Sequence, residues 1–346
     1  MSTVFAKAPL RMALAGGGTD LEPYWSKYGG VVLNGTIDQY AYCKIEPCQC
    51  NHEKCWSFKS VDLGIEERHD FYSTPFMHGE YVDSDLKLLV NTYQYLTAKS
   101  ERHPIKITTY VEAPPGSGLG SSSALVVALI AAIAEYHKIP LGEYDIAEYA
   151  VEIERTICDL PGGKQDQFAA AFGGFNFTEF LTDGRTIVNP LRLNYKTQNM
   201  MELSTVLYYV GKPREDSRVI ENTAKGLVDS EVVLNATHKI KEACIEYKRS
   251  LLTGDMKRIS ELMETYWRSK LETNPHVASP EILDAYEYAL QNGATGAKIS
   301  GAGGGGHMVL FTEFERRHEL ITALKEKEGR VVPFKFVKHG VDVWRQ

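Results

Sequence analysis

The stretch Ala113-Pro114-Pro115-Gly116-Ser117-Gly118-Leu119-Gly120-Ser121-Ser122-Ser123-Ala124 carries a loop of glycines and serines directly into an apolar segment. Glycine lets the main chain take positive φ angles and approach a ligand closely. Every residue from 124 to 134 is apolar, so we expect a buried helix with Ser121 to Ser123 as its N-cap. The first N–H groups of a helix lack partners and attract anions. The loop therefore predicts a phosphate site at the mouth of a packed core.

The same loop has a plainer interpretation, because glycine and serine also dominate ordinary turns. It also lacks the Gly-Lys-Ser/Thr ending of a Walker A loop. Its setting favours the phosphate site. The segment 105–112 alternates like a strand, with Ile105, Ile107, Thr109 and Val111 on one face, so strand, loop and helix follow one another as a phosphate-binding loop requires.

The composition is that of a globular chain of 346 residues, 43% hydrophobic and 24% charged, long enough for two medium domains. Its net charge of -7 offers no basic field for nucleic acid or for an anionic membrane. No stretch approaches the roughly 20 apolar residues needed to span a bilayer, and the N-terminus shows no signal-peptide pattern. We therefore expect a cytoplasmic protein that binds neither nucleic acid nor membrane.

Six cysteines are too few for a disulfide scaffold at this length. Cys48, Cys50, His52 and Cys55 contain enough soft ligands for a zinc site, but their spacing is not that of a common zinc finger. Reduced thiols on a hairpin are the default interpretation. Whether these four residues bind a metal stays open at this point.

Other segments of regular structure surround the loop. Strands are expected at 4–14, 31–33 and 40–45, and a helix is expected from Glu143 to Cys158, with Glu154 in its last turns. After about residue 195 the pattern resets, with a strand at 203–210, helices at 216–251, 256–271, 280–292 and 314–328, and a strand at 331–337. Strands and helices mix too freely for a doubly wound sheet, which favours an α+β fold.

Three glycine-rich segments adjoin strands or helices and could converge on one ligand. They are Ala8-Pro9-Leu10-Arg11 with Gly16-Gly17-Gly18-Thr19-Asp20, then Pro115 to Ala124, then Ser300-Gly301-Ala302-Gly303-Gly304-Gly305-Gly306. In this order they resemble the GHMP kinases over nearly the whole chain. The resemblance implies a two-domain α+β fold with the active site between the domains. The N-terminal domain, 1–195, would be ribosomal protein S5 domain 2-like, and the C-terminal domain, 196–346, ferredoxin-like.

The resemblance also implies roles for individual residues. Asp166 matches the catalytic aspartate of the family, and Arg11 stands where members have a cation beside the acceptor hydroxyl. Ser123 and Glu154 match Mg²⁺ ligands, although one extra residue separates Glu154 from Asp166 relative to the mevalonate kinase pattern. ATP as co-substrate would place its phosphates against Pro115, Gly116, Ser117, Gly118, Leu119, Gly120, Ser121, Ser122, Ser123, Gly303 and Gly304. Without this motif order, a lone Asp before a helix is ordinarily an N-cap.

The first motif, continued by Tyr24, Gly29-Gly30, Asn34 and Ile37-Asp38, resembles the branch of heptose 7-phosphate kinases and fucose kinases, and the heptose enzymes are the closer likeness. That branch phosphorylates the anomeric hydroxyl of a sugar. Sugar contacts are then expected from Gly17, Gly18, Thr19 and Asp20. A sugar phosphate needs a second anion site, for which we expect Arg214 and Ser217. A solvated loop rich in both charges is the alternative.

Two other functions stay open at this point. A free sugar such as L-fucose could be the acceptor, or the chain could be a sensor that binds ATP and sugar without turnover. A sensor is expected to lose parts of the catalytic set, whereas Arg11, Ser123, Glu154 and Asp166 are all present. That favours an enzyme. The sequence does not determine which sugar and anomer are used, which nucleotide is preferred, or whether the protein forms a homodimer.

Overall fold

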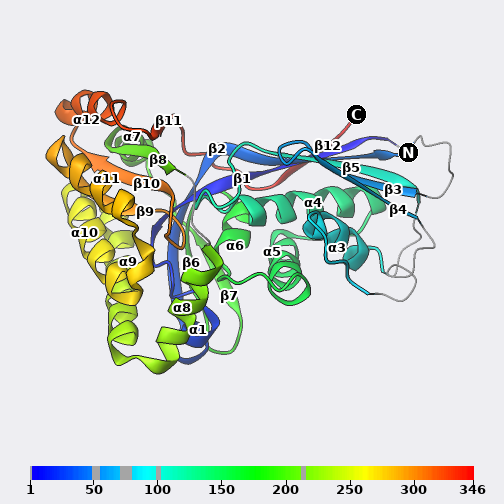
Figure 1. Ribbon diagram of the computed structural model, residues 1–346, viewed down its shortest axis with the longest axis horizontal. Helices are drawn as coiled ribbons and strands as arrows, with labels where there is room; N and C mark the ends of the chain where they lie inside the picture. The colour runs from blue at the N-terminus through cyan, green and yellow to red at the C-terminus, as the bar shows by residue number, and fades with distance from the viewer. Residues whose placement is uncertain (1, 49–54, 71–79, 99–102, 212–215) are drawn as a thin grey trace.

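The computed structural model describes residues 2–48, 55–70, 80–98, 103–211 and 216–346, and within these ranges it has two β-sheets flanked by helices (Figure 1). The larger sheet has the order β12-β1-β2-β5-β3-β4, with β6 paired to β2 and β7 paired to β6. The smaller sheet has the antiparallel order β11-β8-β10-β9. The expected α+β fold is confirmed.

The strands of the larger sheet are β1 (Val4–Ala15), β2 (Gly30–Pro47), β3 (Cys55–Ser60), β4 (Ile65–Asp70), β5 (Ile105–Val111), β6 (Phe175–Phe180), β7 (Thr186–Pro190) and β12 (Asp342–Arg345). Its helices are α1 (Glu22–Tyr28), α3 (Lys87–Leu96), α4 (Ser121–His137), α5 (Glu143–Glu152) and α6 (Gln165–Phe172), with a π-helical turn η1 (Ile153–Ile157) after α5. All pairings given for this sheet are antiparallel except that of β3 with β5.

The smaller sheet contains β8 (Thr205–Gly211), β9 (Ala294–Ile299), β10 (Gly306–Thr312) and β11 (Arg330–Val332). The helices of this half are α7 (Tyr195–Ser204), α8 (Asp216–Asp229), α9 (Glu231–Thr253), α10 (Met256–Thr273), α11 (Pro280–Gln291) and α12 (Arg317–Leu324), with short 3₁₀ turns η2 (Pro275–Val277) and η3 (Phe314–Arg316). Among the described residues, no helix has the length and apolar character that crossing a membrane requires.

Helix α4 is the central helix of the larger half. It runs along one face of the sheet against β1 and β2 (Figure 1), and its residues from Val126 to Ala134 are buried. The predicted helix is therefore confirmed, but its predicted cap is wrong. Gly120, with φ of 73°, occupies the N-cap position, and no side chain caps the helix. A left-handed residue suits this sharp entry because glycine has no Cβ to clash.

Strand β2 is one continuous strand where the sequence predicted two. Residues 30–35 pair with β6, whereas residues 41–47 pair with β5. Strand β1 pairs along both parts of β2, with register shifts near Arg11 and Ala15. Residues 36–40 lie between these two parts, where β2 exchanges one partner for the other.

The chain crosses between its two halves more than once. The last strand, β12, returns to the larger sheet and pairs with β1, and Phe336 forms an isolated bridge with Ile37. The boundary at residue 195 coincides with the start of α7, a helix that the sequence analysis missed. Residues 342–345 thus lie with the N-terminal sheet, and the division into 1–195 and 196–346 stays a prediction.

Candidate active site

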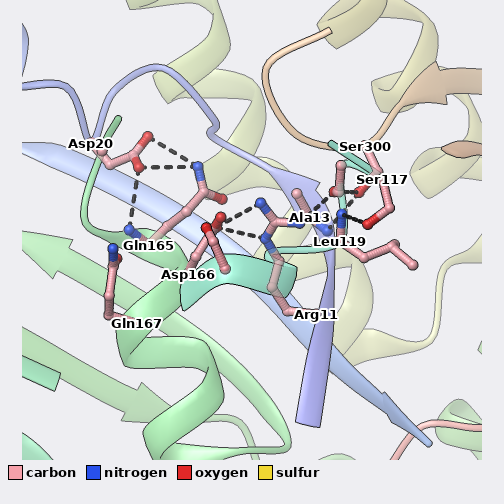
Figure 2. Close-up of polar contacts among 12 residues, drawn as sticks. Arg11, Ala13, Asp20, Ser117, Leu119, Gln165, Asp166, Gln167 and Ser300 are labelled. Carbon is pink, nitrogen blue, oxygen red and sulfur yellow. Dashed lines mark hydrogen bonds and ion pairs between the residues drawn. The ribbon is translucent and has the colours of Figure 1, made fainter. Parts of the chain in front are cut away.

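A buried arginine and a partly exposed aspartate form the centre of the site. Arg11 lies on β1 and is 3% exposed, and Asp166 lies in the first turn of α6. The Nε and Nη2 atoms of Arg11 lie 2.8 and 2.6 Å from Oδ1 of Asp166 (Figure 2). Within the described residues, Oδ2 of Asp166 has no hydrogen-bond partner. The ion pair therefore fixes the carboxylate and leaves one oxygen available.

Arg11 also holds the glycine-serine loop in place. Its Nη1 donates to the carbonyl oxygen of Gly118 at 2.5 Å, and its backbone N–H donates to the carbonyl of Leu119 at 3.0 Å. Ser300 donates its hydroxyl to the same Gly118 carbonyl at 2.9 Å. A Cβ on Gly118 would lie 2.4 Å from the Ser300 carbonyl oxygen, so only glycine permits this close approach.

His307 on β10 fixes the loop from the other side. Its backbone N–H and its Nδ1 lie 3.0 and 2.7 Å from the carbonyl oxygen of Ser117. A carbonyl only accepts hydrogen bonds, so Nδ1 carries a proton. Burial lowers the pKa of His307 to about 4. The imidazole is therefore neutral near pH 7, and it tethers the loop without adding charge to the site.

The glycine-serine loop places the N-terminus of α4 beside Asp166. The first N–H bonded within the helix is that of Ala124, which donates to Gly120 at 2.9 Å. The N–H groups of the preceding serines have no acceptor within the helix, so an anion can accept hydrogen bonds from them. A Cβ on Gly120 would lie 3.2 Å from Oδ2 of Asp166. The aspartate side chain, with its available oxygen, thus lies against the residue at which α4 begins.

Glu154 lies on the π-helical turn η1 and is fully buried. Its carboxylate accepts from the Ser122 hydroxyl at 3.0 Å and from the Gln167 amide at 2.5 Å. The Ser122 oxygen keeps lone pairs for a cation, and hard oxygens are the ligands that Mg²⁺ prefers. A π-helical turn contains one residue more than an α-helical turn. Relative to the mevalonate kinase pattern, one extra residue separates Glu154 from Asp166, and η1 lies in this segment. The donor set fits Mg²⁺, with Ser122 rather than Ser123 in contact with Glu154.

The Gly16–Asp20 turn forms the neighbouring wall of the site. Asp20 accepts from the backbone N–H of Gly18 at 3.0 Å, and both its oxygens lie 3.1 Å from the side-chain nitrogen of Gln165 (Figure 2). Thr19, expected to contact sugar, instead bonds with the backbone of Gly16 and Val31 and is fully buried. Its side chain stabilises the turn, so the sugar contact predicted for Thr19 is corrected.

These elements enclose a cavity of about 360 Å³. Most of the predicted site residues line it: Arg11, Gly17, Gly18, Asp20, Gly116, Ser117, Gly118, Gly120, Ser121, Ser122, Ser123, Glu154 and Asp166. Five of the described ones do not. Thr19 is buried in the turn, Pro115 is exposed outside the cavity and Leu119 is buried in the core, whereas Gly303 and Gly304 lie against Val277. The third glycine segment contributes Gly301 and Ala302 to the cavity instead.

The sequence analysis missed several residues that shape the site. Arg155 donates to the carbonyl oxygens of Leu160 and Gly163 and so holds the loop that forms the cavity rim. Lys270 on α10 lines the cavity beside Gly18, and Lys298 on β9 donates to the Ala13 carbonyl at 2.6 Å. In the sequence, each of these three residues is indistinguishable from an ordinary surface charge. Only the folded structure shows that it lies near the site.

Burial determines the charge of the two lysines. It lowers the pKa of Lys270, and the Asp20 carboxylate partly opposes that shift. Burial lowers the pKa of Lys298 to about 7, and the charges of Arg11 and Lys270 act in the same direction. Lys270 therefore lies beside Gly18 as a buried cation, and Lys298 changes its charge near neutral pH.

Several residues with predicted roles lie outside the described residues. They are Arg214, Cys50 and His52, and the side chains of Ser217 and Cys55 are also not described. The second anion site and the question of a metal at 48–55 are therefore not tested. Among the described residues, no three His, Cys, Asp or Glu side chains gather as a metal site.

The comparisons with known proteins match this geometry. Residues 87–174 match the GHMP kinases N terminal domain, and residues 247–330 match the GHMP kinases C terminal domain. The chain is 40% identical over 347 residues to D-glycero-alpha-D-manno-heptose 7-phosphate kinase of Campylobacter jejuni, with all of both chains covered. The chain therefore belongs to the GHMP kinase family, as the three glycine segments predicted.

Solved structures show the same fold. A D-glycero-D-manno-heptose 1-phosphate kinase from Bacteroides thetaiotaomicron matches with a TM-score of 0.82 and 35% identity over 99% of each chain. Galactokinase of Lactococcus lactis, crystallised with galactose, matches with a TM-score of 0.76 at 16% identity, covering 98% of this chain and 95% of that one. The second match shows the fold alone.

Proposed function

We propose that the protein is an ATP-dependent sugar kinase that phosphorylates the anomeric hydroxyl of D-glycero-D-manno-heptose 7-phosphate. The observation that carries this proposal is the Arg11–Asp166 pair, whose available oxygen faces the N-terminus of α4 inside the shared cavity. Phosphoryl transfer requires this arrangement, because positioning and charge stabilisation supply nearly all of its catalysis. The heptose assignment rests on the likeness to the Campylobacter jejuni enzyme.

In the proposed reaction, the anomeric oxygen attacks the γ-phosphorus and the bond from that phosphorus to the β-phosphate oxygen breaks. ADP leaves with the electron pair of that bond. Oδ2 of Asp166 accepts the proton of the sugar hydroxyl, since Oδ1 is held by Arg11. Arg11 stabilises charge on the transferred group and keeps the loop in register through Gly118.

Glu154 and the serine hydroxyls of α4 would hold Mg²⁺. When bound, the cation offsets the negative charge of the triphosphate. Ser122 and Gln167 orient the Glu154 carboxylate through the hydrogen bonds given above. The N–H groups at the start of α4 supply the remaining contacts to phosphate. Val219, Ile220 and Thr223 of α8 also line the cavity.

A coupled assay of ADP release tests the proposal. We expect release with the heptose 7-phosphate, and we expect Asp166→Asn to lower kcat by about 10³-fold or more, because the carboxylate loses its charge and its basicity. Asp145→Asn, an exposed position on α5, is the matched control and should behave as wild type. Faster turnover of free L-fucose would replace the heptose assignment, and no release with any sugar would indicate a sensor.

A further inference from the structure

Lys270 is a buried cation that the catalytic scheme does not use. It lies in the last turns of α10 and is 6% exposed. Within the residues that the structure describes, its ammonium group has no hydrogen-bond acceptor within 3.5 Å and no ion-pair partner within 4.0 Å. A buried charge without a partner costs several kcal/mol or more in the ordinary case. A buried, unpaired ammonium group at this position therefore calls for a functional explanation.

The ammonium of Lys270 faces the cavity and not the core. Lys270 lines the cavity together with Gly17, Gly18 and Asp20. A methyl group on Gly18 would lie 3.8 Å from its Nζ. Tyr266, one helical turn earlier on α10, directs its hydroxyl to the carbonyl of Gly17 at 3.4 Å. One face of α10 therefore packs on the Gly17–Gly18 turn and presents Lys270 beside it.

Asp20 gives the cation an anionic neighbour whose position is fixed. Gly18 and Gln165 hold the Asp20 carboxylate, and its charge acts on Lys270. A phosphate dianion at this point would meet like charge from Asp20. A sugar hydroxyl meets no such repulsion, because it can donate to Asp20 and accept from Lys270 at once.

We infer that Lys270 binds a ring hydroxyl of the sugar together with Asp20, and so makes α10 of the C-terminal half a determinant of sugar specificity. This inference rests on the proposed function. The pair recognises a hydroxyl because Lys270 only donates hydrogen bonds and Asp20 only accepts them, whereas a hydroxyl does both. A sugar without the matched hydroxyl leaves the buried ammonium unpartnered, which discriminates against it.

Kinetics of Lys270→Met and Lys270→Gln test the inference. With the heptose 7-phosphate, we expect Lys270→Met to raise KM about 10–100-fold, the value for a lost charged hydrogen bond, and to change kcat little. Lys270→Gln keeps a donor and should recover part of the loss. Lys257→Met, an exposed position on the same helix, is the control and should behave as wild type.

Deoxy substrates identify the group that is bound. Wild type should discriminate strongly against one of the 2-deoxy, 3-deoxy and 4-deoxy analogues of the heptose 7-phosphate, and Lys270→Met should lose that discrimination. Calorimetry of sugar phosphate binding to Asp166→Asn, with and without Lys270→Met, provides a measurement without turnover. The melting temperature should stay the same or rise in Lys270→Met, because an unpaired buried charge has been removed.

Three outcomes would overturn the inference. An unchanged KM in both variants would remove Lys270 from the sugar site. A penalty for the heptose phosphate but none for the free heptose would assign Lys270 to the phosphate. A lower melting temperature in both variants with uniform loss of activity would assign it a structural role. Absence of turnover by wild type with every sugar would instead refute the proposed function, so the two failures are distinguishable.

Discussion

The two ends of the cavity differ in how their charges are held. At the end near α4, each charged group has a protein partner: Arg11 bonds with Asp166 and Gly118, and Glu154 bonds with Ser122 and Gln167. At the end near α10, Asp20 is held, but Lys270 has no acceptor within the described residues. The chemical end is thus organised before any ligand binds, and the other end keeps a donor for the substrate.

This difference predicts which kinetic parameter each end of the cavity affects. Preorganised groups act on the transition state without reorganisation, so losing one of them should lower kcat. A group that waits for the substrate contributes chiefly to ground-state binding, so its loss should raise KM. The comparison therefore makes a separate kinetic prediction for each end of the cavity.

After that of Asp166→Asn, the largest effect is expected from Arg11→Met. We expect kcat to fall about 10²–10³-fold, because Asp166 loses its ion pair and the loop loses its bond to Gly118. Arg249→Met, exposed on α9, is the control. The double variant with Asp166→Asn should cost little more than Asp166→Asn alone, since the pair acts as a unit. Fully additive losses would show that the two residues work independently.

A smaller effect is expected from Glu154→Gln. The Mg²⁺ concentration for half-maximal rate should rise at least about tenfold, because the neutral amide is a poorer ligand for a hard cation. Titration of the rate with Mg²⁺ measures this, and chelation with EDTA should abolish activity in wild type. Glu152→Gln lies two residues earlier and is exposed, so its titration should match wild type. An unchanged Mg²⁺ requirement in Glu154→Gln would contradict the metal assignment.

The smallest effect concerns stability and comes from Lys298. Its pKa is about 7 in the folded protein and about 10.4 when unfolded. Between these values the unfolded state binds more protons, so the stability of wild type rises with pH. Relative to Lys298→Met, the free energy of unfolding should increase by up to about 1.4 kcal/mol per pH unit above pH 7. Urea unfolding at pH 7 and pH 9 measures it, and an equal difference at both values would refute it.

Sequence reasoning found the chemical end because its residues lie in contiguous motifs. Arg11 and Asp166 each belong to a motif whose likeness to the family predicted the role, although their hydrogen bond joins segments 155 residues apart. Lys270 could not be found in this way, because the amphipathic segment 256–271 gives no sign of which charge faces the other half of the molecule. Its position depends on α10 packing against the Gly16–Asp20 turn, a contact between distant segments.

Within the motifs, the sequence did not predict which way each group points. Thr19 and Gly304 occupy motif positions. The Thr19 hydroxyl donates to the backbone carbonyls of Gly16 and Val31, and the Gly304 N–H donates to the carbonyl of Val277. Element boundaries failed for similar reasons. The predicted helix 216–251 is two helices, because Ser230 caps α9 by accepting from the Val233 N–H at 3.4 Å. That signal, a serine followed by a glutamate, was present in the sequence.

The pairing of β12 with β1 has a consequence for how the protein is made. Residues 342–345 cover the outer edge of the strand that carries Arg11. During translation, that edge stays unpaired until residues 342–345 have been synthesised. An exposed strand edge can recruit other chains, and a contact this distant in sequence forms slowly. The nascent chain therefore exposes an aggregation-prone edge of β1 until β12 has left the ribosome.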